Sequence, residues 1–325
     1  MNKEDKVLNF LRSNRLDFLS GEEISKKLGV SRAAVWKDIQ HLRSLGYEIE
    51  AEPHRGYRLT AIPDKMFADE ISWQLPTKIV GRNIFSYEEL DSTNDAAFQL
   101  GKDGIKEGAC VFAEYQKKGR GRLGRRWESP KGKNLLLSVL LRPVLSPADV
   151  PKITLAAALS VARAARSLTG ADLGIKWPND LLFKGKKVGG ILTEMNAEAD
   201  RVHFVVLGIG VNVNGAKKEL PPEATSLKEI AGKTISRLEF ARELLAQLEK
   251  DYIVFKNGAF DTLANEWENL SVTSGRRVSA GVPGRKVQGQ VVGIDKDGAL
   301  WIRKDNGLQE RILAGDVTLL RQSHG

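Results

Sequence analysis

A basic, glycine-rich segment at residues 116–127 holds the residue types that bind small anions. Six of its residues are Lys or Arg, three are Gly, and Trp127 closes it. Arginine presents a planar fork of donors that matches carboxylate or phosphate oxygens, and glycine lets backbone N–H groups approach an anion. The indole offers a flat face to a base. Because like charges repel and glycine is costly to order, we expect the segment to order around an anionic ligand that carries a nucleotide base.

The same segment matches a dinucleotide-binding fingerprint through Gly119, Gly121 and Gly124. That fingerprint needs a strand before it and a helix directly after it. The apolar run 109–114 supplies the strand, but residues 125–132 contain Pro and Gly and are a poor helix start, which disfavours a Rossmann fold. A solvated basic loop, or one that binds nucleic acid without sequence preference, stays open as an alternative on the segment alone.

A second group of polar residues precedes an expected helix. Residues 91–94 read Asp-Ser-Thr-Asn and offer several N-cap side chains to a helix that ends near residue 102. Since one cap is sufficient, Ser92 and Thr93 are candidates for ligand contacts at the helix N-terminus.

A third group surrounds an expected hairpin. Residues 176–180 read Lys-Trp-Pro-Asn-Asp, and the second strand of the hairpin opens with Lys187 and contains two glycines. Glycine within a strand marks the close approach of a ligand or backbone, so we expect Lys187 to face a ligand. Asp180 is expected to orient its neighbours rather than to bind a metal. Residues 208–212 form another close-approach site that ends at Asn212.

The composition limits the kind of protein that positions these groups. With 325 residues the chain is expected to form two or three domains. Its N-terminus is charged and its apolar runs stay well below the ~20 residues of a membrane span, so we expect a cytoplasmic protein without a membrane partner. The single Cys110 lies in an expected strand and is read as core, and the four histidines lack metal-ligand spacing. A formal net charge of +9 favours anionic partners.

Residues 1–63 show a helix-turn-helix pattern followed by a hairpin wing. Ser20 and Glu23 form a capping box, Gly29 ends that helix, and Ser31 caps a second helix over 32–45. Such a module places its second helix in the major groove, and dimers bind paired half-sites; docking to a protein is the alternative. The residues expected to contact DNA are Ser31, Arg32, Ala33, Trp36, Lys37, Gln40, Arg55 and Arg58.

The remaining chain divides into a mixed α/β region at 64–270 and a strand-rich region at 271–325. Residues 64–75 are a candidate connecting helix, and residues 215–225 form a loop long enough for a lid. The spacing of strands after residue 277 predicts a small barrel or sandwich. Further strands are expected at 83–87, 109–115, 134–141, 181–183, 187–194 and 202–208, and helices at 153–168 and 236–256.

The order of three motifs, at residues 119–127, 176–180 and 187–191, resembles biotin–protein ligases. With the N-terminal module, nearly the whole chain resembles bifunctional bacterial ligases that also repress the biotin operon. The resemblance implies an α+β multidomain fold: a winged helix-turn-helix, a central mixed sheet with helices like class II aminoacyl-tRNA synthetases, and a C-terminal SH3-like β-barrel. Looser forms of the last two motifs occur in lipoyl ligases, which remain an alternative, as do a ligand-sensing repressor without catalysis and a nucleic-acid protein with an arginine-glycine loop.

The resemblance also implies a reaction and a set of roles. Biotin and ATP, with Mg²⁺ on the phosphates, give biotinyl-5′-AMP, and biotin then passes to a lysine of the biotin carboxyl carrier protein domain. Biotinyl-5′-AMP would act as corepressor by driving a homodimer onto operator DNA. The resemblance assigns the polar ring of biotin to Ser92, Thr93 and Gln116, with Asn94 as a further ligand-binding residue, and the loop over the ligand to Arg120, Gly121 and Arg122. It assigns the carboxylate and α-phosphate to Lys187 and the adenosine to Trp127 and Asn212. The catalytic cations that offset the repulsion between carboxylate and triphosphate are expected to be Lys187, Arg120 and Arg122.

Overall fold

The structure is a computed structural model that describes residues 3–282 and 284–320. Its contacts separate two compact units, Met1–Lys65 and Met66–Gly325. The expected boundaries after residues 63 and 270 stay predictions, because the second unit contains both remaining regions.

The first unit is the predicted winged helix-turn-helix. Its order is α1 (Lys3–Ser13), α2 (Gly21–Leu28), α3 (Arg32–Ser44), β1 (Glu48–Glu52) and β2 (Gly56–Ala61). Local capping explains these bounds: Ser20 accepts a hydrogen bond from the Glu23 N–H at 3.0 Å, and Ser31 accepts one from Ala34 at 3.1 Å. The turn between α2 and α3 contains Gly29 at a φ of 66°, a left-handed conformation that glycine adopts without strain.

The second unit is built on a mixed sheet of seven strands in the order β3-β4-β5-β9-β8-β7-β6. Only the β3–β4 pair is parallel among the ladders of this sheet. The central strand β5 is buried along its whole length, which explains its nearly continuous apolar sequence. The strands are β3 (Ile84–Tyr87), β4 (Cys110–Ala113), β5 (Leu135–Leu141), β6 (Gly174–Lys176), β7 (Asp180–Phe183), β8 (Lys186–Ala197) and β9 (Val202–Val211).

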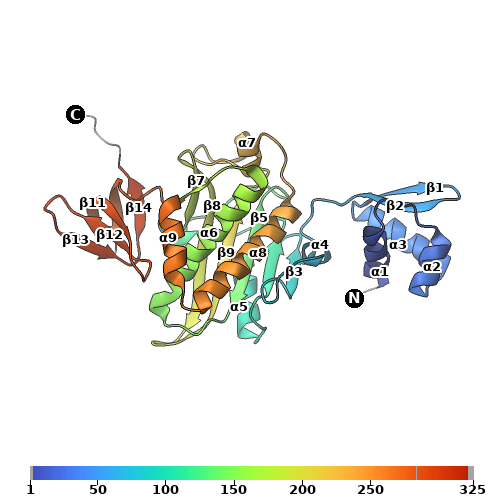
Figure 1. The fold of residues 1–325 in the computed structure, drawn as a ribbon, viewed down its shortest axis with the longest axis horizontal. Helices are drawn as coiled ribbons and strands as arrows, with labels where there is room; N and C mark the ends of the chain where they lie inside the picture. Colours follow the sequence, from blue (N-terminus) through green and yellow to red (C-terminus); the bar gives the residue numbers. More distant parts are fainter. Residues whose placement is uncertain (1–2, 283, 321–325) are drawn as a thin grey trace. The chain divides into compact units, whose positions relative to one another are not determined.

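Helices cover both faces of this sheet. α6 (Val150–Thr169) and α8 (Arg237–Lys256) lie side by side across one face, as Figure 1 shows, and α9 (Phe260–Leu270) packs against both. α5 (Thr93–Lys102) packs on the other face, where Ala97 meets Phe204 and Val206 of β9. Within the described ranges, no helix combines the length and the apolar character that a membrane span needs.

Three helical segments differ from the sequence prediction. The helix expected over 64–75 is reduced to α4 (Ala68–Ser72), because Pro76 disfavours helix in the residues before it and Gln74 has a φ of 53°. α7 (Leu227–Ala231) and α9 were not predicted. α9 had a readable signal, since Phe260, Leu263 and Trp267 are buried at helical spacing.

The C-terminal region is an antiparallel sheet of five strands in the order β13-β12-β11-β10-β14. β13 and β14 are the outer strands of the ladder over the described residues, so the SH3-like closure of the barrel stays a prediction. The strands are β10 (Arg277–Val282), β11 (Arg285–Ile294), β12 (Leu300–Arg303), β13 (Gln309–Ile312) and β14 (Asp316–Leu319).

Candidate functional site

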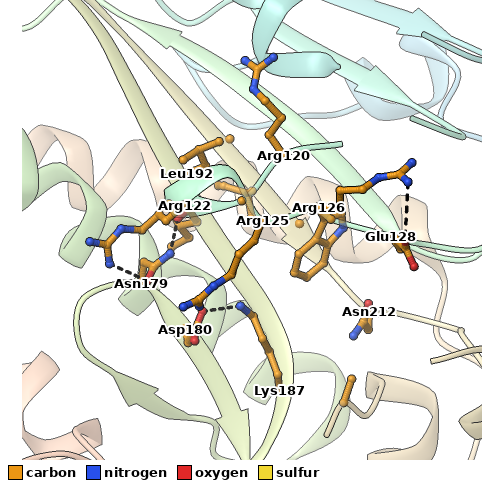
Figure 2. Close-up of a pocket in the computed structure, with 18 of the residues that line it drawn as sticks. Arg120, Arg122, Arg125, Arg126, Glu128, Asn179, Asp180, Lys187, Leu192 and Asn212 are labelled. Carbon is orange, nitrogen blue, oxygen red and sulfur yellow. Dashed lines mark hydrogen bonds and ion pairs between the residues drawn. The ribbon is translucent and has the colours of Figure 1, made fainter. Parts of the chain in front are cut away.

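A cavity of about 650 Å³ opens on the α5 face of the mixed sheet. Its wall combines strands β8 and β9, the N-terminus of α5, the basic segment and β14. Figure 2 shows Arg120, Lys187 and Asn212 among the residues that line it. The structure therefore brings together every ligand-binding residue expected from the sequence, although those residues span more than a hundred positions. They are Ser92, Thr93, Asn94, Gln116, Arg120, Gly121, Arg122, Trp127, Lys187 and Asn212.

Glycines on β9 form a floor on which site side chains lie. A Cβ on Gly210 would sit 2.6 Å from Cε2 of Trp127, and one on Gly208 would sit 2.1 Å from Oδ1 of Asn94. The expected strand stopped at residue 208, whereas β9 continues to Val211, so both glycines lie within it on one face. Their missing side chains leave the space that Trp127 and Asn94 occupy.

The polar end of the cavity is a buried hydrogen-bonded group at the start of α5. Oε1 of Gln116 accepts from the Thr93 N–H at 2.7 Å and from its hydroxyl at 2.9 Å. Ser138 of β5 lies below them, 2.8 Å from the Thr93 hydroxyl and 2.6 Å from Oδ1 of Asn94. Ser138 was missed by the sequence analysis; the single hydroxyl in a buried apolar strand was its signal. The group presents fixed donors and acceptors, together with Ser92, to a polar ligand.

Arg120 is held by carboxylates beside this group. Its guanidinium binds Asp95 bidentately at 2.6 and 2.7 Å and lies 3.3 Å from Glu194. Glu194 in turn accepts from the Asn94 amide at 2.6 Å. The hydrogen bond with Asp95 raises the pKa of Arg120, and Figure 2 shows the side chain pointing away from Lys187. Arg120 thus belongs to the polar end of the cavity, and Asp95 and Glu194 are site residues that sequence reasoning missed.

Lys187 stands at the other end, in an ion pair with Asp180. Its Nζ is 2.5 Å from Oδ1 of Asp180 (Figure 2), and Lys176 lies 3.7 Å from the second oxygen. The same ammonium is 5.7 Å from the centre of the Trp127 ring, within the range of a cation–π contact. A Cβ on Gly190 would come within 3.2 Å of the Lys187 side chain, so this glycine leaves room for the lysine.

The basic segment is a folded turn rather than an open loop. Gly121 N–H donates to the Arg125 carbonyl at 2.7 Å, and Trp127 N–H donates to the Gly119 carbonyl at 2.9 Å. Leu123 at its tip has a φ of 56° and is 74% exposed. Within the described part of the chain, the buried indole Nε1 of Trp127 has no hydrogen-bond partner, which leaves a donor for a ligand atom.

The turn also meets the C-terminal sheet. Arg122 donates to the Gly315 carbonyl at 2.9 Å and to Oδ1 of Asn179 at 3.3 Å (Figure 2). Asp316 forms a close ion pair with Arg125 and lies 4.0 Å from Arg122. Burial lowers the pKa of Arg122, against the attraction of Asp316.

Asn212 lies at the junction with the expected lid. Its Oδ1 accepts from Asn134 at 3.0 Å, and its amide donates to the Thr225 carbonyl at 3.2 Å. The loop is also tied to β8, because the Lys187 N–H donates to the Glu223 carbonyl at 2.8 Å. The end of the loop is therefore fixed to the strand that carries Lys187.

The helix-turn-helix unit presents its expected DNA contacts in two ways. Most of the α3 set is exposed: Ser31, Arg32, Ala33, Trp36 and Lys37 are exposed and Gln40 is half-buried. The wing arginines instead pair with wing glutamates: Arg55 with Glu52 at 2.6 Å and Arg58 with Glu50 at 2.7 Å. Both guanidinium groups also stack on Phe18, 4.2 and 4.5 Å from its centre. For the wing to contact DNA phosphates, Arg55 and Arg58 must therefore break their ion pairs with the glutamates or contact the phosphates while keeping those pairs.

In residues 3–282 and 284–320, no cluster of three or more His, Cys, Asp or Glu side chains could hold a metal ion. Asp180, the strongest single candidate, is paired with Lys187.

Comparison with known proteins gives three family matches in chain order. Residues 3–58 match a helix-turn-helix domain, residues 87–212 the biotin/lipoate A/B protein ligase family, and residues 273–320 the biotin protein ligase C-terminal domain. The chain is 38% identical to the bifunctional ligase/repressor BirA of Bacillus subtilis over 93% of its length and 94% of the relative. It is 32% identical to the protein of the same name from Escherichia coli, over 93% of each.

A solved structure resembles about three quarters of the chain. The biotin protein ligase from Aquifex aeolicus in complex with biotin and ATP matches with a TM-score of 0.63 and 32% identity, covering 74% of this chain and 100% of that one. A ligase from Mycobacterium tuberculosis, named for acetyl-CoA carboxylase as its acceptor, is 38% identical over 66% of this chain and 80% of its own.

Proposed function

Because the chain belongs to the biotin protein ligase family and is a biotin–protein ligase with a repressor helix-turn-helix domain, we propose that its cavity joins biotin to ATP as biotinyl-5′-AMP and presents that adenylate to an acceptor lysine. The observation that carries this proposal is the division of the cavity: a buried polar group at one end and cations with an indole at the other.

The polar group suits the ring of biotin. Ser92 and Thr93 offer buried donors and acceptors at the N-terminus of α5, and half-buried Gln116 pairs with Thr93. Hydrogen bonds shielded from solvent discriminate against a ligand that cannot pair with them. Asn94 and Arg120 both donate hydrogen bonds to Glu194 and lie at the same end of the cavity. Lipoate carries a dithiolane ring without such polar atoms, so the group favours biotin.

The cationic end suits the first chemical step. A carboxylate oxygen of biotin attacks the α-phosphorus of ATP, and pyrophosphate leaves. Both reactants are anions, so fixed cations must offset their repulsion. Lys187, oriented by Asp180 at 2.5 Å, and Arg122 take that role. Mg²⁺ arrives with the ATP phosphates as part of the substrate.

The adenosine falls to Trp127 and Asn212. The indole packs against Gly210 and offers an aromatic surface for adenine stacking, and Asn212 directly follows the end of β9 and lines the same cavity. The turn of the basic segment then covers the reactive anhydride and keeps water away. Gly121, whose backbone N–H closes that turn, allows the backbone to approach the ligand.

The second step transfers biotin to protein. The lysine amine of a biotin carboxyl carrier protein domain attacks the acyl carbon of the adenylate, and AMP leaves. The decisive assay mixes the full-length protein with labelled biotin, MgATP and acceptor domain, and follows pyrophosphate release and label on the acceptor. Replacing biotin by lipoate distinguishes a lipoyl ligase. Ligand binding without pyrophosphate release would indicate a sensor that lacks catalysis.

The repressor function uses the exposed face of α3. Because its proposed ligands are operator DNA and ATP, we expect the protein to act in the cytoplasm. Binding of biotinyl-5′-AMP against the basic turn alters the surface there, and the altered surface pairs two subunits so that two α3 helices meet paired half-sites. Operator affinity measured by gel shift should rise when biotin and MgATP are added, and sedimentation should show a dimer. Equal operator affinity in both conditions would contradict this coupling.

A further inference from the structure

We propose that Asp316 of the C-terminal sheet is a positioning residue whose carboxylate competes with ATP phosphate oxygens for Arg122 and Arg125. The proposal rests on the ligase function above and assigns to the C-terminal domain a competing carboxylate within the ATP-binding end of the cavity.

Geometry identifies Asp316 as the fixed partner. It opens β14 and pairs in register with Gly281 of β10, and a Cβ on the preceding Gly315 would lie 2.6 Å from the Gly281 carbonyl. The carboxylate is thus anchored on tightly packed backbone. Its partner Arg125 sits on an exposed turn and is itself 64% exposed, so the arginine is the side that moves.

Asp316 differs from the carboxylates that pair with the other site cations. Asp95 pairs with Arg120 and Asp180 with Lys187, and in both pairs the carboxylate and the cation lie between residues 95 and 187. Asp316 comes from the C-terminal sheet and serves both Arg122 and Arg125. Its side chain is 32% exposed and lines the cavity. A triphosphate brings more negative charge than one carboxylate, so the arginines gain by exchanging Asp316 for phosphate.

The competition between Asp316 and phosphate predicts that removing the carboxylate charge strengthens ATP binding. In Asp316→Asn the side chain keeps its shape, but Arg122 and Arg125 no longer pair with a carboxylate. The phosphates of ATP are then no longer repelled by a negative charge at this position. We expect the KM for ATP in pyrophosphate release to fall about two- to fivefold, as for one partly exposed ion pair. The KM for biotin should change less than twofold, because the biotin-binding end lies with Thr93 and Gln116. Loss of a residue needed only for folding would not lower the KM for ATP while leaving the KM for biotin nearly unchanged.

A second readout needs no ligand and no activity. Limited trypsin digestion of the full-length protein should cleave after Arg122 and Arg125 faster in Asp316→Asn, with cleavage sites assigned by mass spectrometry. The matched control is Asp305→Asn. That residue also lies in the C-terminal region and pairs bidentately with an arginine, Arg277, at 2.6 Å, outside the cavity. The control should leave both KM values and the cleavage rates after Arg122 and Arg125 unchanged.

The outcomes separate the two proposals. If the parent protein releases no pyrophosphate, the proposed ligase reaction fails, while the trypsin rates still judge the Asp316 contact. If the parent is active and Asp316→Asn shows an equal or higher KM for ATP, the competing role is overturned. If Asp316→Asn keeps the parent's thermal midpoint and is cleaved after Arg122 and Arg125 at the parent's rates, the contact between Asp316 and these arginines is overturned. In an Arg125→Gln background the effect of Asp316→Asn on the ATP constant should shrink, and an undiminished effect also counts against the exchange.

Discussion

Replacing Lys187 by alanine tests the cation assigned to the first chemical step. The ammonium lies 2.5 Å from Asp180 and 5.7 Å from the centre of the Trp127 ring, and it is 34% exposed. A well-aimed donor contributes about 2.7–4 kcal/mol to transition-state stabilisation. Because Lys187 is partly solvated, we take the lower end and expect adenylate formation to slow on the order of a hundredfold.

The paired carboxylate adds a second, separable effect. Lys187→Ala leaves Asp180 with Lys176, at 3.7 Å, and the more distant Arg122 as neighbouring cations, so a less compensated negative charge faces two anionic substrates. Adding Asp180→Asn removes that charge and should restore about three- to tenfold of the lost rate. If Asp180 only orients Lys187, the double variant is the better enzyme of the two. If it has a role of its own, the double variant is slower still.

Single-turnover adenylation provides the assay. Enzyme in excess is mixed with α-labelled MgATP at saturating biotin, and labelled biotinyl-5′-AMP is followed in a quenched-flow instrument. Lys186→Ala is the matched control, since Lys186 precedes Lys187 in β8 but is exposed and outside the cavity. The control should keep the parent rate. A Lys187→Ala rate equal to that of the parent would refute the assignment of this cation to the adenylation step.

Three further changes probe other parts of the molecule. Arg122→Ala removes the contact between the turn and the C-terminal sheet, and we expect biotinyl-5′-AMP to dissociate about tenfold faster in a chase experiment; an unchanged rate would exclude a retaining role. Gly210→Ala places a Cβ 2.6 Å from Trp127, so the KM for ATP should rise about tenfold, and a rise in the biotin KM alone would contradict the adenine assignment. Burial disfavours the charge on Asp295, but hydrogen bonds led by Arg311 outweigh it and lower the pKa to about 2 from 3.8. This carboxylate therefore stabilises the fold above pH ~4 and loses that effect as the pH falls toward 2; Asp295→Asn should lower the thermal midpoint at pH 6 more than at pH 3, and an equal loss at both would count against it.

Much of the fold was predictable because its signals are local. Ser20, Gly29 and Ser31 mark the bounds of the helices in the first unit through neighbouring backbone groups, and these contacts lie within a few residues. The C-terminal strands followed from alternation and glycine turns. The helix over 64–75 was overestimated because Pro76 has a local effect that was not weighed. α9 was overlooked although its buried stripe was present in the sequence.

The sequence by itself determined which residue types the site would contain. Basic side chains, glycines and a tryptophan at fixed spacing specify a ligand that is anionic and carries a flat ring, whatever the fold around them. Only the tertiary structure decided which carboxylate each cation meets. Arg120 meets Glu194, 74 residues away, and Arg125 meets Asp316, 191 residues away. The energy of an ion pair depends on distance and burial, and both are set by how the sheets and helices pack rather than by the order of residues along the chain.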